Sequence, residues 1–112
     1  MKISSLLKDL QYKEERPAVQ VLLDSDAGKE IRIAFKKGQE MKEHHAPFPI
    51  VVEVFEGHIL FGVEGEKVDL KRGDLITLKS KVPHDLKALQ DSIVRLSLSR
   101  ADGIERVEKV TE

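Results

Sequence analysis

The sequence predicts an all-β domain, a sandwich or a barrel built from short strands. Three observations support this fold class. Apolar residues alternate with other residues in many short segments between residues 18 and 99. Turn signals rich in glycine and aspartate separate these segments at intervals of about 8–12 residues. The spacers are also too short for the helices that connect parallel strands.

The N-terminal residues 3–10 have apolar side chains at the spacing of a helix face: Ile3, Leu6, Leu7 and Leu10. This spacing predicts a short amphipathic helix or an irregular arm, and Ser4 or Ser5 could cap its first turn. Pro17 separates the segment from the first predicted strand.

The middle of the chain contains the predicted strands, near residues 18–23, 31–35, 50–55, 59–63, 68–70, 75–78, 86–89 and 92–99. Gly57, Gly65 and Gly73 stand in the turns between strands, where a positive φ is needed. The segment that contains Met41 and Glu43, just before His44, is interpreted as a loop.

The C-terminal residues 100–112 are highly charged, with Ile104, Val107 and Val110 spaced by three. We expect a tail there, or a short terminal strand or helix. The chain of 112 residues is the size of one domain. We therefore divide residues 1–112 into an arm (1–17), a barrel (18–99) and a charged C-terminal tail (100–112).

The composition excludes several classes of function. The chain has no cysteine, so disulfides, thiolate metal sites, Fe–S clusters and cysteine nucleophiles are ruled out. Nineteen Lys and Arg nearly balance 20 Asp and Glu, and aromatic residues make up only 4%, which argues against nucleic-acid binding. No apolar run is long enough for a signal-peptide core or a membrane span. We expect a cytoplasmic protein that binds no membrane.

The four histidines are the candidates for chemistry: His44, His45, His58 and His84. Histidine is the commonest metal ligand and the usual acid or base near neutral pH. Without cysteine, a transition-metal site must be built from histidines and carboxylates. Glu53 and His58 are out of phase with the apolar residues of their strands, so we expect both to face outward.

Six residues stand at the spacing of two sequence motifs: Gly38, His44, Gly57, Gly73, Asp74 and His84. This pattern resembles the conserved motifs of the cupin superfamily over residues 31–99. The first motif there is a glycine, five residues, His-x-His, a glutamate three or four residues on, and a glycine after six more. The second is a glycine, five residues, Pro-x-Gly, a histidine after two residues and an asparagine after three more. The resemblance implies a double-stranded β-helix (jelly-roll) β-barrel, as in small bacterial single-domain cupins.

The motifs are degenerate at the positions that matter most for a metal. The second histidine of the first motif falls on Ala46, and its glutamate falls on Ile50. The proline, glycine and asparagine of the second motif fall on Lys79, Lys81 and Ala88. Of the four metal ligands usual in cupins, only His44 and His84 stand at matching positions.

The resemblance implies that a small-molecule ligand binds in the barrel mouth, at His44 and His84, with His45 as a further ligand-binding candidate. His44 and His84 would also hold a divalent transition metal, Fe, Mn, Ni or Zn, if one is bound; no other cofactor is expected. The alternative is a metal-dependent oxygenase or isomerase, in which His84 or His45 could move protons, but the sequence identifies no catalytic residue. A third alternative is an interaction module that acts through its sheet surface.

Small cupins commonly form homodimers, and the apolar residues of the arm have little core of their own to join. We therefore expect a homodimer in which Ile3, Leu6, Leu7 and Leu10 cover an edge or an outer face of the partner.

Overall fold

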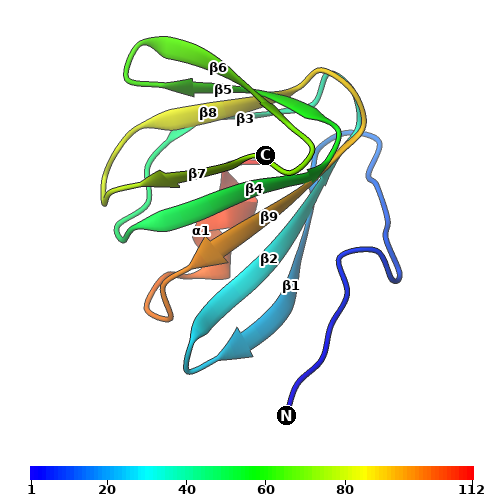
Figure 1. Cartoon of the computed structure of the whole chain (residues 1–112), viewed down its shortest axis with the longest axis vertical. Helices are drawn as coiled ribbons and strands as arrows, with labels where there is room; N and C mark the ends of the chain where they lie inside the picture. Colours follow the sequence, from blue (N-terminus) through cyan, green and yellow to red (C-terminus); the bar gives the residue numbers. More distant parts are fainter.

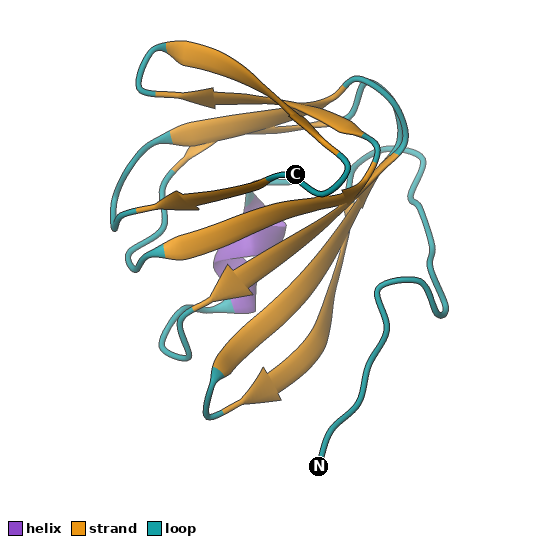
Figure 2. Cartoon of the chain, in the orientation of Figure 1, coloured by secondary structure: helices purple, strands orange, loops and turns teal.

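The computed structural model describes all 112 residues, which form nine strands and one short helix (Figures 1 and 2). In chain order these are β1 (Ala18–Ser25), β2 (Gly28–Phe35), β3 (Glu40–His44), β4 (Ile50–Glu56), β5 (His58–Val63), β6 (Glu66–Lys71), β7 (Leu75–Leu78), β8 (His84–Ala88), β9 (Ser92–Leu98) and α1 (Ile104–Lys109). The predicted all-β class is confirmed. The one helix has six residues, so no helix here could cross a membrane.

The strands form two antiparallel sheets, which Figure 1 shows as an upper and a lower layer. The lower sheet has the order β1-β2-β9-β4-β7, and the upper sheet has the order β3-β8-β5-β6. Strands β2 to β9 have the order of an eight-stranded jelly roll, and β1 adds one more strand beside β2. Every ladder lies within one of the two sheets, so the architecture is that of two packed layers.

The core lies between the two sheets because each strand directs alternate side chains inward. On β4 the buried residues are Ile50, Val52 and Val54, and on β5 they are Ile59 and Phe61. Eighteen buried apolar residues form one contiguous cluster that includes residues of both sheets and of α1. A single cluster of this kind is the expected core of one domain.

Glycines close three of the turns in the left-handed conformation that the sequence predicts. Gly57, between β4 and β5, has φ +98°, Gly65 has φ +78° and Gly73 has φ +90°. A residue with a Cβ would be strained at each of these positions.

Strand β3 was not predicted, and the interpretation of its residues as a loop is wrong. Met41 is the only apolar residue in Glu40–His44, so no alternation marks the strand in the sequence. Pairing with β8 forms it instead, with Met41 opposite Leu86 and His44 opposite His84. The register shifts between Met41 and His44, which is a bulge or a similar irregularity.

The N-terminal arm is irregular, the second of the two forms expected for it. It lies against the lower sheet of its own chain, where Arg32 of β2 holds it. Arg32 is buried, with only 2% of the residue exposed. Its guanidinium donates hydrogen bonds of 3.0–3.4 Å to four main-chain carbonyl oxygens of the arm, those of Ser5, Leu6, Lys8 and Asp9.

The C-terminal segment forms the helix α1, one of the three forms that its sequence allowed. Val107 is 1% exposed and belongs to the core cluster, while Ile104 and Val110 pack against that cluster. The spacing of three between these apolar residues is therefore the signature of a helix face. Figure 2 shows the helix behind the sheets.

Candidate functional site

The structure brings His44 and His84 together although 39 residues separate them in the sequence. His44 is the last residue of β3 and His84 is the first of β8, and the two are direct register partners. Their ring centroids are 4.3 Å apart, with the ring planes inclined at 60°. The convergence predicted from the motif spacing is thus observed.

A main-chain oxygen fixes the orientation of each ring. His44 Nδ1 lies 2.6 Å from the carbonyl oxygen of Lys42, and His84 Nδ1 lies 2.9 Å from that of Val82. A carbonyl oxygen only accepts hydrogen bonds, so Nδ1 must carry the proton in both rings. In the neutral state each Nε2 then keeps its lone pair, and neither Nε2 makes a hydrogen bond within the protein.

Burial keeps both imidazoles neutral. It is the main cause that lowers the pKa of His44 to about 4, and it also lowers the pKa of His84. The Lys42 and Val82 carbonyls oppose this shift because they accept from the protonated ring. The positive charge of Arg106, on α1, lowers both pKa values further. Near pH 7 the pair therefore presents two unprotonated nitrogen atoms.

The pair lies at an apolar cavity between the two sheets. The ring of Phe61 stacks on that of His84, with centroids 5.6 Å apart and planes inclined by 8°. Eleven residues line the cavity, eight of them hydrophobic, and its polar residues are His44, His84 and Arg106. Met41 of β3 is one of the eight hydrophobic residues.

Apolar residues stand where cupins usually have further metal ligands. Ala46 and Ile50 are both 3% exposed members of the core cluster, and Ile50 lines the cavity beside the histidines. No group of three or more His, Asp or Glu side chains in the structure is placed so that it could hold a metal ion. The chain thus offers two nitrogen ligands at this site and no third protein ligand.

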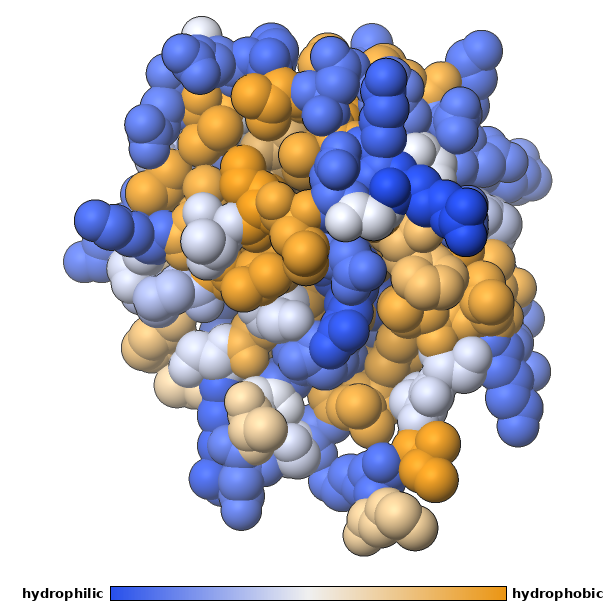
Figure 3. Space-filling model, viewed as in Figure 1, coloured by the Kyte–Doolittle hydropathy of each residue, from blue (hydrophilic) through white to orange (hydrophobic).

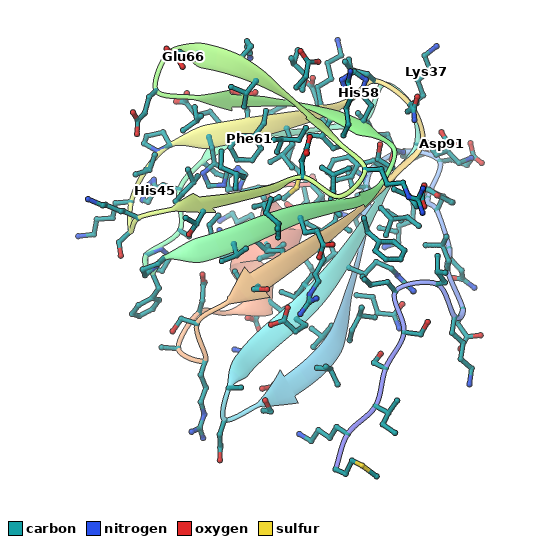
Figure 4. The ribbon with its side chains drawn as sticks, viewed as in Figure 1. Lys37, His45, His58, Phe61, Glu66 and Asp91 are labelled. Atoms are coloured by element: carbon teal, nitrogen blue, oxygen red, sulfur yellow. The ribbon has the colours of Figure 1, made fainter.

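The other candidate residues lie elsewhere. His45 is exposed, one residue beyond the end of β3. His58 is on the outer face of the upper sheet, where its Nε2 lies 2.7 Å from an Asp69 carboxylate oxygen. Glu53 also faces outward, 3.8 Å from Arg95. Figure 4 shows His45 on the left side of the molecule and His58 at the upper right.

Six residues of the cavity wall were not predicted from the sequence: Arg106 and Val107 of α1, and Ile33, Leu86, Val94 and Leu96 of the strands. A signal for Arg106 was present, because Asp102 precedes it by four residues and such pairs meet on a helix. Nothing in the sequence indicated which face of the domain this helix would cover.

Comparison with known proteins agrees with the strand order. The cupin domain family model matches residues 31–99, more than half of the chain. No curated protein matches the chain in sequence. An RmlC-like cupin from Desulfovibrio desulfuricans has a similar structure, with a TM-score of 0.78 and 24% identity over 89% of this chain and 97% of that one.

Two further solved structures have the same fold. One is an uncharacterized conserved protein with a double-stranded β-helix domain from Klebsiella pneumoniae, with a TM-score of 0.79, 19% identity and coverage of 92% and 94% of the two chains. The other is KdgF from Halomonas sp., with a TM-score of 0.72, 21% identity and coverage of 82% and 88%. Identities this low support the fold alone. Together with the match of the family model, they show that the chain belongs to the cupin superfamily.

Proposed function

We propose that this cupin binds a small organic molecule between its sheets, at the His44–His84 pair, with a divalent metal held by the two Nε2 atoms. The observation that supports this most is the anchoring of both Nδ1 atoms on main-chain carbonyls. Ligand histidines of metal sites usually donate their second ring nitrogen in this way, which fixes the tautomer and orients the ring.

Two side chains, His44 and His84, fit as ligands of such a metal. Imidazole nitrogens suit Zn, Fe and Ni, and the low pKa of His44 keeps its ring free of the competing proton. No third side chain joins the pair, so the organic ligand and water would complete the coordination shell. When bound, the metal would act as a Lewis acid toward a polar or carboxylate group of the ligand.

The enzyme alternative has less support from the same residues. Non-haem iron oxygenases typically use two histidines and one carboxylate on one face of the site. Here Ile50 occupies the position of the family glutamate, and no carboxylate lies with His44 and His84. Binding is therefore the function that this set of side chains supports best.

Metal uptake by variants that each lack one histidine tests the proposal. In protein purified without a tag or chelator and titrated with Zn²⁺ or Ni²⁺, we expect about one equivalent per chain. Either His44→Ala or His84→Ala should abolish uptake with limited loss of stability, because each removes one of only two protein ligands. His58→Ala is the matched control and should bind normally. His45→Ala measures whether that exposed ring adds a ligand. Uptake that survives both of the first two substitutions would contradict the proposal.

We also propose a homodimer that uses the exposed apolar residues of the arm. Ile3 is 83% exposed and Leu7 is 56% exposed, whereas Leu6 and Leu10 are half-buried against their own chain. On the face seen in Figure 3, apolar side chains gather in two areas with a hydrophilic band between them.

Sedimentation equilibrium at micromolar concentration measures this assembly. The wild-type chain should sediment as a dimer, and removal of residues 1–12 should yield the monomer. The double variant Ile3→Ser, Leu7→Ser should weaken the dimer while leaving the contacts of Leu6 and Leu10 in place. A wild-type species of 12.7 kDa would refute the dimer.

A further inference from the structure

The C-terminal segment closes the cavity at the histidine pair. Val107 fills one side of it and Arg106 another, both beside His44 and His84. With α1 in place the cavity has a volume of about 10 Å³. That is room for about one water molecule and not for an organic ligand. His84 is only 3% exposed, so its side chain is shielded from solvent.

Few bonds attach this segment to the sheets. The main-chain hydrogen bonds outside the strands that involve residues 102–112 stay within the segment or reach Ser99. The attachment consists of the apolar contacts of α1, an ion pair of 3.2 Å between Arg100 and Asp26, and the bonds of Lys29, whose ammonium group donates to the carbonyl oxygens of Arg100 and Asp102. The segment can therefore move without breaking a single sheet ladder.

An internal ion pair makes the segment a coherent unit. Arg106 Nε and Nη2 lie 2.9 and 2.8 Å from the two carboxylate oxygens of Asp102, which is itself buried. The same carboxylate accepts a hydrogen bond from the main-chain N–H of Gly103. These bonds join the start of the segment to its helix, so both parts are expected to move together.

We propose that residues 100–112 form a lid, which has to swing away from His44 and His84 before a ligand can enter the cavity. This rests on the proposed function for the identity of the site, whereas the opening itself can be measured without a metal. The lid lies outside residues 31–99, the part that matches the cupin family model.

Carbethoxylation by diethyl pyrocarbonate, followed by peptide mass spectrometry, tests the lid. The reagent attacks an unprotonated ring nitrogen that it can reach, so the rate at His84 reports how often the lid opens. His58, on the outer face, serves as the internal reference in every sample. In the wild-type protein His84 should react much more slowly than His58.

Two variants loosen the lid by different means. Val107→Ser removes its apolar contact in the cavity, and Lys29→Met removes its hydrogen bonds to Arg100 and Asp102. Each should speed modification of His84 about tenfold relative to His58, equivalent to about 1.4 kcal/mol of weaker closure. Val68→Ser, a change at a residue packed against the core from β6, is the matched control and should leave this ratio unchanged.

The result that overturns the lid is a ratio that stays at the wild-type value in Lys29→Met and in Val107→Ser, or that is already close to one in the wild type. Lys29→Met leaves the core intact, so it decides the question if Val107→Ser does not fold. Zn²⁺ titration of the same samples separates the two proposals. A gated His84 in protein that takes up no Zn²⁺ would refute the metal site and support the lid.

Discussion

Replacement of Gly57 by alanine is expected to lower the free energy of unfolding by about 3–5 kcal/mol, as strain and overpacking add together. Gly57 has φ +98°, where an L-residue is strained. A Cβ there would also lie 2.2 Å from Ser92 Oγ and 2.5 Å from the carbonyl oxygen of Asp91. The chain cannot relieve this overlap cheaply, because Ser92 is fully buried in β9 and its main chain is among the atoms that would clash.

Gly65→Ala is the matched control for this variant. Gly65 also has a positive φ, +78°, yet a Cβ there would meet nothing within 4 Å. This variant should lower the free energy of unfolding by only about 1–2 kcal/mol, the cost of the left-handed conformation alone. Urea denaturation of the two variants and of the wild type measures the difference. Equal losses at the two positions would show that the contact with β9 has no part in the requirement for glycine.

Acidification is expected to destabilise the metal-free protein between pH 6.5 and about pH 4, through the histidine pair. The pKa of His44 is about 4 in the folded protein and 6.5 as an ordinary value, so the unfolded chain binds more protons in this window. The contribution to stability is then complete above pH 6.5 and falls as the pH drops toward 4. The ring is partly exposed, so we discount the full linkage energy to about 1–2 kcal/mol for His44. The lowered pKa of His84 acts in the same direction.

Urea midpoints measured at several pH values between 7.5 and 4.5, in the presence of a chelator, test this dependence. His44→Gln should flatten the curve in the window, because it removes a group whose protonation the fold opposes. His45→Gln, at the exposed neighbour, should keep the wild-type slope. A His44→Gln curve parallel to that of the wild type would show that acid destabilisation arises elsewhere.

Most of the strand pattern was predictable because alternation of apolar residues follows directly from a sheet with one buried face. The segments around Ile31, Val52 and Phe61 are examples, as are the glycine turns between strands. Strand β3 was not predictable in this way. Its single inward apolar residue, Met41, has no alternating partner, and the strand depends on pairing with β8.

The candidate site, too, was predictable from the sequence only in part. The approach of His44 to His84 was predictable from the motif spacing, which fixes their place on the fold. The sequence also showed that Ala46 and Ile50 stand where cupins usually have metal ligands. The cavity closure by Val107 and Arg106 was not, because the spacing of Ile104, Val107 and Val110 defines a helix face and leaves the docking position of that helix undetermined.

The way in which Arg32 holds the N-terminal arm affects how freely the arm can change during evolution. All four arm groups that it binds are main-chain oxygens, which every residue type supplies. Substitutions at positions 5, 6, 8 and 9 can therefore accumulate without removing an acceptor. Selection to keep residues 5–9 docked would act on Arg32 more than on the residues whose carbonyl oxygens it binds, and we expect related chains to vary in this part of the arm while they retain this arginine.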